Sequence, residues 1–372
     1  MVGDRAFWAG KRVFLTGHTG FKGAWLALWL TDLGAKVTGY SLAPPTEPSL
    51  FEAARVRDLI VHLPGDVRDL PSLSAAVHRA QPEIVIHLAA QSLVRLSYVQ
   101  PVETYDINVM GTVNLLEAVR RTSGVRAVVC VTSDKCYENH ETDTPYVETD
   151  AMGGYDPYSS SKGCAELVTS ALRRSFFNPA TMAEHRVGVA SARAGNVIGG
   201  GDWARDRLVP DLMRAFSSGA RPVIRFPGAI RPWQHVLEPL SGYLLLAERL
   251  HAGEARVANG WNFGPAEDDA RPVDGIADTV SDLWGDGAGW DVTGEPQPHE
   301  AHYLRLDCGK AERELGWRPV WSLAEGLERT VEWYKANAGG RDMREFTRHQ
   351  IRAYARARAS AAPAAPAGAA HG

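Results

Sequence analysis

The chain has 372 residues, of which 45% are hydrophobic and 23% charged, and 40 basic against 44 acidic side chains give a net charge of −4. This composition is that of an ordinary globular protein and excludes small disulfide scaffolds and disordered chains. It provides no general attraction to nucleic acid or to an anionic membrane, because that attraction needs a clustered excess of Lys and Arg. An anion must therefore be bound by a local site, and the length suggests two lobes with a cleft between them.

The first residues contain no long apolar run, so we expect no secretory signal, and no window approaches the roughly 18 apolar residues of a membrane span. The four cysteines include no Cys-x-x-Cys pair, so we expect reduced thiols, no metal site and a cytoplasmic protein. These cysteines are Cys130, Cys136, Cys164 and Cys308.

In the first half of the chain, short β-rich runs alternate with helical patterns. Apolar residues recur every three or four positions in the intervening segments, as at 24–33 and 112–121, which predicts helices. Strands that are apolar throughout and separated by helices predict a parallel sheet covered on both faces, which is the doubly wound α/β (Rossmann) class. The predicted strands are residues 12–16, 36–40, 59–63, 84–88, 127–132 and 187–192.

After residue 195 the pattern becomes irregular and rich in proline, with helices predicted at 235–250 and 323–335. We expect a discontinuous arrangement, in which residues 1–195 and 235–258 form the dinucleotide-binding domain and residues 196–234 and 259–338 form a smaller α+β substrate lobe. Residues 339–372 are expected to form an Arg-rich helix followed by a disordered Ala/Pro tail. We interpret the arginines of this helix as a solvated face, with a partner or nucleotide contact as the alternative.

The first predicted strand runs directly into a G-x-x-G-x-x-G turn, and a helix follows. Glycine at this spacing permits a tight turn, the close approach of a pyrophosphate and close helix packing. The phosphates would lie at the helix N-terminus, whose free N–H groups and dipole favour anions. The strand before and the helix after this turn therefore predict a dinucleotide site. Its loop residues are Gly17, His18, Thr19, Gly20, Phe21, Lys22 and Gly23, and Lys22 either lies near a phosphate or extends into solvent.

Two further strand ends are predicted to contact the dinucleotide. The carboxylate of Asp66 can accept a hydrogen bond from an adenine amine, although an ordinary loop or N-cap aspartate is the alternative. The second strand ends in Gly39-Tyr40-Ser41, which has neither the acidic residue typical of NAD sites nor an adjacent arginine for NADP, so these residues leave the choice of dinucleotide open. The predicted contacts are Asp66 and Val67 after the third strand and Leu88, Ala89 and Ala90 after the fourth.

A Y-x-x-x-K pair, Tyr158 and Lys162, lies on one face of a predicted helix that Asp156-Pro157 opens. A lysine ammonium near a phenol favours the phenolate, so the tyrosine can take a proton from a substrate alcohol while hydride leaves to nicotinamide. The fifth strand ends in Ser133-Asp134-Lys135. This is the end of a parallel strand, where an open α/β sheet binds its ligands.

These motifs, together with Asn108, resemble those of the extended short-chain dehydrogenase/reductase family, which binds NAD(P) on a Rossmann fold. More closely, the chain resembles the nucleotide-sugar 4,6-dehydratases, through residues 16–23 (TGHTGFKG), 132–139 (TSDKCYEN), 193–203 (RAGNVIGGGDW) and 231–236 (RPWQHV). The resemblance spans most of residues 10–335. It implies NAD as the cofactor, with Asn108 among the cofactor residues, and a homodimer or tetramer whose interface is a four-helix bundle built from the helices near 104–121 and 158–173.

The resemblance also implies a closed redox cycle, in which Tyr158 deprotonates the 4-hydroxyl of a glucosyl group, water leaves across C5 and C6, and the hydride returns to C6. Ser133 would hold the 4-hydroxyl, Asp134 would protonate the departing C6 hydroxyl, and Lys135 would remove the C5 proton. Lysine at 135 matches the CDP-glucose branch, since the dTDP-glucose and GDP-mannose branches have glutamate there. CDP-glucose is therefore the expected substrate, and Tyr137 remains an alternative carrier of the C5 proton.

The second lobe is expected to bind the nucleotide half of the substrate. Arg231 suits bidentate phosphate binding and Asn196 can donate to a pyrophosphate oxygen, whereas Trp203 is either a packing residue or a base contact. The rival functions are a nucleotide-sugar 4-epimerase, which needs no acid and base at C5 and C6, and a redox-sensing module, which needs no proton acceptor. A surface ion pair is the alternative for Asp134 and Lys135. The predicted substrate contacts are Gln91, Asn196, Arg207 and Arg231.

Overall fold

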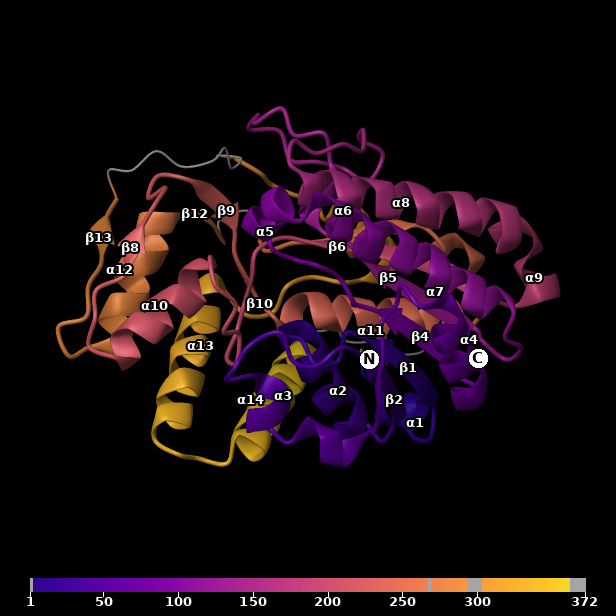
Figure 1. Cartoon of the computed structure of the whole chain (residues 1–372), viewed down its shortest axis with the longest axis horizontal. Helices are drawn as coiled ribbons and strands as arrows, with labels where there is room; N and C mark the ends of the chain where they lie inside the picture. Colours follow the sequence, from indigo (N-terminus) through magenta and orange to yellow (C-terminus); the bar gives the residue numbers. More distant parts are fainter. Residues whose placement is uncertain (1–2, 267–268, 294–302, 362–372) are drawn as a thin grey trace, which may run out of the picture.

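The computed structural model describes residues 3–266, 269–293 and 303–361. Two lobes lie side by side in Figure 1: a large one built on a single sheet, and a smaller one formed by α10, α12, α13 and short strands. Within the described ranges, no helix combines the length and the apolar character needed to cross a bilayer.

Seven parallel strands form the sheet of the large lobe, in the order β11-β6-β5-β4-β1-β2-β3. The doubly wound α/β prediction is therefore confirmed. The six predicted strands are present, although β3 begins two residues late because Leu59 belongs to the short helix η1. The bounds are β1 Arg12–Thr16, β2 Lys36–Ser41, β3 Val61–Pro64, β4 Ile84–His87, β5 Ala127–Val131, β6 Gly188–Ala194 and β11 Gly260–Phe263.

The seventh strand, β11, was not predicted and lies in the stretch expected for the substrate lobe. It pairs in parallel with β6, so the chain returns to the sheet after leaving it. The run Gly-Trp-Asn-Phe has only four residues and contains a glycine and an asparagine, both rare in strands, which explains why its pattern predicted no strand. The sheet therefore extends beyond the boundary expected at residue 258.

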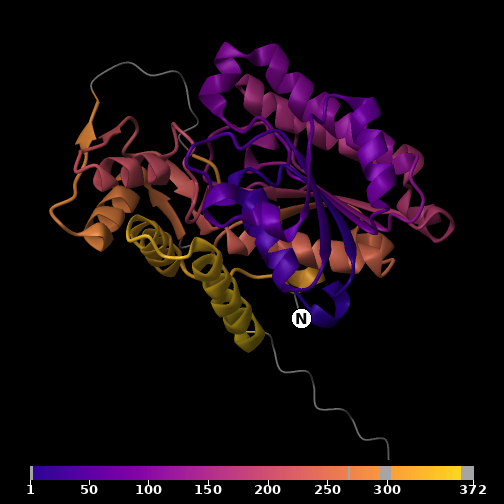
Figure 2. The same cartoon turned by 60° about the horizontal axis from the view of Figure 1, so that its bottom comes forward.

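Helices cover both faces of the sheet, as Figure 2 shows. Successive side chains of a strand point to opposite faces, so a strand covered on both sides is apolar at every position. In β5, Val129 packs in the core formed with α2 and α11, and Val128 packs in the core formed with α4 and α7. The helices of this lobe are α2 Phe21–Asp32, α4 Leu70–Ala80, α7 Gly111–Arg120, α8 Pro157–Phe176 and α11 Leu237–His251.

Shorter helices complete the large lobe. The segment from α5 to α7 forms nearly continuous helix, with π-helix η2 between α6 and α7. The bounds are α1 Arg5–Trp8, α3 Leu50–Ala53, η1 Val56–Leu59, α5 Val94–Val99, α6 Pro101–Tyr105, η2 Asp106–Met110, η3 Asp134–Cys136, η4 Pro179–Thr181, α9 Met182–His185, η5 Ala255–Val257 and π-helix η7 Ala311–Leu315.

The smaller lobe packs α12 against both α10 and α13 and adds three two-stranded sheets. One of these, β7 with β10, follows β6 directly and connects the lobes. The bounds are α10 Leu208–Ser217, α12 Val273–Trp284, α13 Leu323–Ala338, β7 Val197–Ile198, β8 Val223–Ile224, β9 Ile230–Pro232, β10 Gln234–His235, β12 Ala270–Pro272 and β13 Asp291–Val292.

The predicted Arg-rich helix exists as α14 (Met343–Ala361), but its arginines do more than face solvent. Arg344 lies 2.8 Å from Asp58 and Arg352 lies 2.6 Å from Asp32, both in the large lobe. The fully buried Tyr354 donates its hydroxyl to Glu238 on α11 at 2.7 Å. α14 is therefore docked on the large lobe, beside α2 and α3 in Figure 1. The tail predicted to be disordered lies, from residue 362, outside the described residues.

Candidate active site

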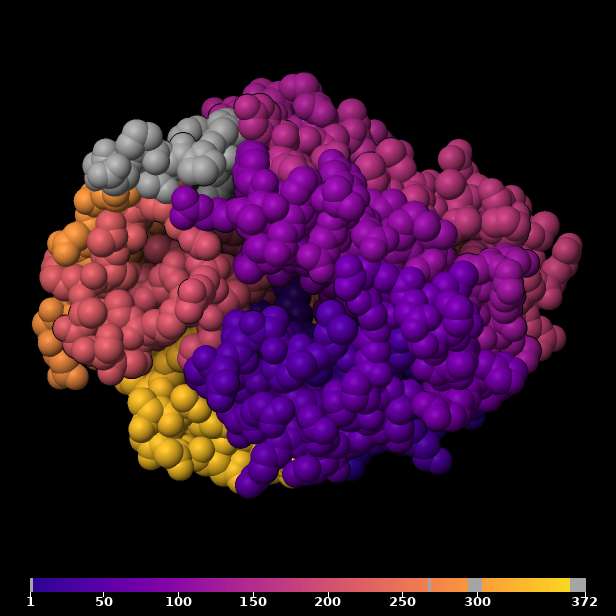
Figure 3. Space-filling model, viewed as in Figure 1, coloured from indigo at the N-terminus to yellow at the C-terminus, as the bar shows by residue number. Residues whose placement is uncertain are grey.

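The carboxyl ends of β1, β4, β5 and β6 meet at one edge of the sheet, where a parallel sheet binds ligands. Figure 3 shows a hollow in the surface, between N-terminal residues in indigo and later residues in purple, next to the smaller lobe. Most of the predicted site residues follow these four strands.

The glycine loop has the geometry of a pyrophosphate cradle. Gly17 has a φ of +76°, and a Cβ there would lie 2.6 Å from the nitrogen of Ala89. A Cβ at Gly23 would lie 2.1 Å from the carbonyl oxygen of Gly17, so neither position has room for a side chain. Gly20 begins α2 without a side-chain cap, which leaves the first N–H groups of the helix for an anion. The loop therefore fits a dinucleotide.

Two loop side chains brace the loop from within the fold. His18 is fully buried, with its Nε2 2.7 Å from Nδ1 of His62, and burial lowers the pKa of His18 to about 3, so its ring is neutral. Thr19 Oγ1 lies 2.8 Å from Ser41 Oγ and donates to the carbonyl of Leu42. These side chains fasten the loop to the ends of β2 and β3, and Phe21 packs against the core below it.

Lys22 does not simply extend into solvent. The site groups whose charges act on it include Arg207, Asp134 and Lys162, so its side chain faces the strand ends. Burial lowers its pKa to about 8, and Asp134 opposes that effect. The placement of Lys22 near a cofactor phosphate stays a prediction.

The loop after β3 holds Asp66 in its own ion pair. Asp66 accepts the backbone N–H of Arg68 at 2.9 Å and pairs with the Arg68 guanidinium at 2.6 Å. These contacts are those of an ordinary loop aspartate, which was the alternative to adenine binding. A hydrogen bond from an adenine amine to Asp66 stays a prediction. Val67 is buried against Gly111, where an added Cβ would lie 2.7 Å from it.

Asn108 and Gln91 connect the end of β4 to α8. Asn108 donates to Ser161 Oγ at 2.8 Å and to the carbonyl of Gln91 at 3.0 Å. The Gln91 amide donates to Thr104 and to the carbonyl of Leu93. The Gln91 side chain is thus engaged within the large lobe, and its predicted substrate contact stays untested. Leu88, Ala89 and Ala90 lie half-buried along the approach to the glycine loop.

Tyr158 and Lys162 form the predicted pair on α8, and both are buried. Lys162 Nζ lies 6.0 Å from the centroid of the Tyr158 ring. Burial raises the pKa of Tyr158 to about 12, and a hydrogen bond with Ser133 opposes that rise. Burial lowers the pKa of Lys162 to about 8. The lysine is therefore an ammonium at neutral pH, and its stabilisation of a Tyr158 phenolate stays a prediction.

The strand-end segment, residues 133–135, presents a buried carboxyl group next to this pair. Ser133 Oγ donates to Asp134 Oδ1 at 2.9 Å, while Oδ2 is buried and accepts no hydrogen bond from any described residue. Burial raises the pKa of Asp134, and the charge of Lys135 opposes the rise. Since Asp134 is only 2% exposed, the surface ion-pair interpretation does not fit. The group therefore has one buried oxygen that no described residue satisfies with a hydrogen bond.

Tyr137, the alternative carrier of the C5 proton, is occupied elsewhere. Its hydroxyl accepts from Arg193 Nη1 at 2.6 Å and donates to Asn262 Oδ1 at 2.7 Å. Burial raises its pKa well above the usual range. Lys135 is half-buried beside Asp134, which leaves it the better candidate.

The second lobe brings two arginines to the strand ends. Arg207, just before α10, pairs with Asp202 at 2.8 Å and donates to Ser92 Oγ in the large lobe at 2.9 Å, so it bridges the lobes. Arg231 on β9 is buried, and its charge acts on Asp134. Asn196 is half-buried directly after β6.

Trp203 lies 5.4 Å from the Trp333 ring, and its other ring neighbour is Tyr334 at 5.6 Å. These contacts support packing over contact with a base.

Sequence reasoning missed a buried ion pair between Glu166 of α8 and Arg193 of β6, whose charged atoms lie 2.8 Å apart. In the sequence, Arg193 stands out only as the first residue of the motif at 193–203. The available signal was the spacing of Glu166, four residues after Lys162 and so on the same helix face. No group of three or more His, Cys, Asp or Glu suited to a metal ion occurs in the described part of the chain.

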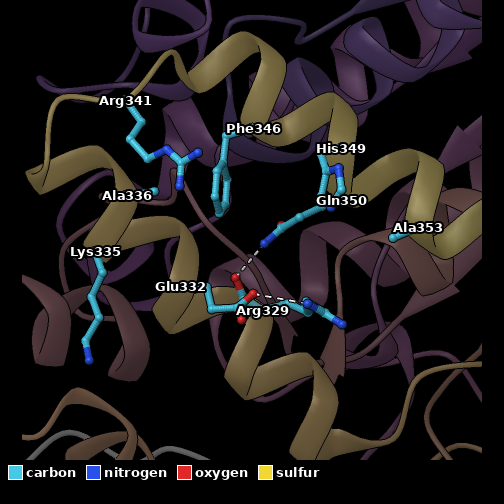
Figure 4. A pocket seen from close by; sticks show the side chains of 9 residues that line it. All are labelled: Arg329, Glu332, Lys335, Ala336, Arg341, Phe346, His349, Gln350 and Ala353. Atoms are coloured by element: carbon cyan, nitrogen blue, oxygen red, sulfur yellow. Dashed lines mark hydrogen bonds and ion pairs between the residues drawn. The ribbon is translucent and has the colours of Figure 1, made fainter.

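A separate cavity of about 530 Å³ lies between α13 and α14 (Figure 4). Its cations already have partners: Arg329 lies 3.2 Å from Glu332, and Lys335 donates to the carbonyl of Leu283 at 2.9 Å. None of its lining residues belongs to the strand ends, so it is not part of the candidate active site.

Residues 14–264 match the family model described as GDP-mannose 4,6 dehydratase. The chain is 58% identical to CDP-glucose 4,6-dehydratase of Salmonella typhimurium over 351 residues, which is 94% of this chain and 98% of the relative.

Solved structures with the same fold include UDP-glucose 4-epimerase of Thermotoga maritima with UDP-glucose (TM-score 0.76, 20% identity, 87% of this chain and 99% of that one). A double mutant of the dTDP-glucose 4,6-dehydratase of Streptomyces venezuelae is similar (TM-score 0.75, 24% identity, 89% and 99%). The resemblance expected from the glycine loop and the Tyr158–Lys162 pair is confirmed, and the chain belongs to the nucleotide-sugar 4,6-dehydratase family.

Proposed function

We propose that this protein is an NAD-dependent CDP-glucose 4,6-dehydratase, which converts CDP-glucose to CDP-4-keto-6-deoxyglucose and water. The relative that is 58% identical over nearly the whole chain bears this name. The observation that carries the proposal is the buried Asp134 carboxyl beside Tyr158, whose Oδ2 accepts no hydrogen bond from any described residue. A 4-epimerase stops at the 4-ketone and has no need of an acid there.

The cradle at Gly17 and Gly23 supports a dinucleotide, and the choice of NAD rests on the family. The solved structure of the Streptomyces venezuelae dehydratase contains NAD. When bound, NAD would supply the hydride acceptor for oxidation at C4 and, once reduced, the hydride for C6. The chain supplies the anion-binding N-terminus of α2 and the glycine positions where the backbone comes close.

The residues divide the proton transfers among them. Tyr158, beside the Lys162 ammonium, is the proposed acceptor of the 4-hydroxyl proton, and Ser133 orients that hydroxyl. The ketone at C4 then acidifies C5–H, and Lys135 is the proposed acceptor of that proton. Asp134, whose pKa burial raises, is the proposed proton donor to the leaving C6 hydroxyl. Arg207, Arg231 and Asn196 bind the pyrophosphate from the second lobe.

The test offers CDP-glucose, UDP-glucose, dTDP-glucose and GDP-mannose separately with NAD. Formation of a 4-keto-6-deoxy sugar is followed by its absorbance in alkali. We expect product from CDP-glucose and a loss of about 10²–10⁴ in kcat for Tyr158→Phe, which removes the proton acceptor. Release of a C4 epimer without loss of water would favour the epimerase, and absence of product from every sugar would refute the dehydratase.

The oligomer expected from the family would be formed through a surface on α5, α6, η2 and α8. Large apolar side chains are exposed there, although such side chains usually avoid water over an extended area. We propose a homodimer through this surface, tested by light scattering of the wild type and of Val102→Glu. The exposed residues of this surface are Tyr98, Val99, Val102, Tyr105, Met110, Leu167 and Phe176.

We also propose a cytoplasmic location, because none of the four cysteines forms a disulfide.

A further inference from the structure

The ion pair of Glu166 and Arg193 lies beside the candidate active site, with about 5% of each side chain exposed. We propose, on the basis of the proposed function, that Glu166 and Arg193 are positioning residues. They hold the strand-end segment (residues 133–135) in its place against the Tyr158–Lys162 pair. The structure supports this through contacts at both ends of the segment.

At the front of the segment, Glu166 joins α8 to two strands. Its Oε1 accepts from Thr132 Oγ1 at 2.5 Å, and its Oε2 accepts from Ser191 Oγ at 2.7 Å. Thr132 directly precedes Ser133. The helix that carries Tyr158 is thus fastened to the residue between β5 and the strand-end segment.

At the rear of the segment, Arg193 holds the residue that follows η3. Its Nη1 donates to the Tyr137 hydroxyl at 2.6 Å and to the carbonyl of Glu148 at 3.1 Å. The Tyr137 hydroxyl in turn donates to Asn262 on β11. One ion pair therefore fixes both ends of a six-residue stretch, 132–137.

Stability alone is a weak reason for such a pair. Taking two charges out of water costs free energy that apolar side chains of similar volume would not cost. What an apolar pair cannot do is satisfy the hydroxyls of Thr132, Ser191 and Tyr137 in one arrangement. The pair therefore suits the fixing of a geometry that catalysis needs.

Glu166 also acts on Lys162 through its charge. Burial lowers the pKa of Lys162, and Glu166, one helical turn away, opposes that shift. Although burial favours the neutral acid, Arg193 holds the pKa of Glu166 below its usual value, so Glu166 is an anion. Removing that charge makes Lys162 lose its proton at lower pH. The groups that face Lys162 are Lys22 of α2, His87 of β4, Cys130 of β5, Cys136 of η3, and Tyr158 and Glu166 of α8.

The test is Glu166→Gln, which keeps the shape and removes the charge. We expect kcat for CDP-glucose to fall at least about tenfold with little change in KM. In the profile of kcat against pH, the alkaline limb should shift to lower pH by about one unit. Glu238→Gln is the matched control, because it removes another buried carboxyl, that of Glu238 on α11, which does not contact the strand-end segment. The alkaline limb of this variant should match that of the wild type. A Glu166→Gln enzyme with the wild-type kcat and limb would overturn the proposal.

Thr132→Val keeps the proposal testable if Glu166→Gln folds poorly. It removes one hydroxyl and no charge, so kcat should fall several-fold while the limb stays in place; an unchanged kcat would contradict the role of the front contact.

A readout without turnover separates this inference from the proposed function. The chain has only seven lysines, so NMR titration of their side chains, with Lys162→Met assigning the signal, reports the ionisation of Lys162 directly. If CDP-glucose is no substrate, the proposed function fails, but a lower titration midpoint in Glu166→Gln still supports the coupling. An unshifted midpoint refutes it.

Discussion

Replacing Lys162 by methionine removes the cation beside the Tyr158 phenol while keeping a side chain of similar length. The ammonium lies 6.0 Å from the ring centroid. At that separation and an effective dielectric constant of about 20, its attraction for a phenolate is about 3 kcal/mol. A loss of about 3 kcal/mol of transition-state stabilisation lowers kcat about 100-fold.

The pKa of Lys162 predicts the pH range in which the substitution has its largest effect on kcat. Burial lowers the pKa of Lys162 to about 8, so the cation is present below that pH and lost above it. The wild type should therefore exceed Lys162→Met most near neutral pH, and the ratio should shrink towards one as the pH rises beyond 8. The assay is kcat for CDP-glucose across this range, measured by the alkaline absorbance of the product.

A matched control is Lys310→Met. Lys310 also lies over an aromatic ring, 4.2 Å from the centroid of Trp261, but it is on neither α8 nor a strand end. Its loss should leave the profile of kcat against pH unchanged. If Lys162→Met lost less than about threefold at neutral pH, or lost the same factor at every pH, the electrostatic account of the Tyr158–Lys162 pair would be refuted.

Three further changes test other parts of the molecule. Asp134→Asn can still accept a hydrogen bond from Ser133 but has no acid proton, so turnover should fall about 10²–10⁴-fold. Deuterium from solvent should still enter C5, which mass spectrometry can check. Full turnover would exclude Asp134 as the acid. Burial raises the pKa of Glu238 from 4.5 to about 7, so the wild type should lose stability as the pH rises between these values, by up to about 3 kcal/mol. Urea unfolding at pH 5 and 8 should show that Glu238→Gln lacks this loss of stability. The same change in unfolding free energy between the two pH values in both proteins would contradict the prediction. Gly23→Ala forces a Cβ to within 2.1 Å of a backbone oxygen, so calorimetry should find NAD binding weakened at least about tenfold. Gly228→Ala is the control and should bind NAD normally, because a Cβ added at Gly228 meets no heavy atom within 4 Å.

Several features follow from short stretches of sequence. Strands such as β1 and β5 are apolar on both faces, and this local pattern predicts a covered parallel sheet without knowledge of any partner. The glycine loop is equally local, because the three glycines, the strand before and the helix after occupy one short segment. Tyr158 and Lys162 share a helix face through the helical repeat alone.

Other features depend on residues far apart in the chain, and their pairing leaves no periodic signal. β11 becomes a strand because β6, about 70 residues earlier, offers an open edge. The arginines of α14 look like a solvent-exposed series until tertiary packing brings Asp32 and Asp58 to them.

The same reason applies to the site. Sequence alone identified Ser133, Asp134 and Tyr158 as candidates, because each follows a recognisable local element. Only the tertiary structure decided that one oxygen of Asp134 is buried without a hydrogen-bond donor among the described residues, and that Glu166 of α8 meets Arg193 of β6. Burial and hydrogen-bond partners are set by the whole fold, so they determine the protonation of these groups in a way that no local pattern encodes.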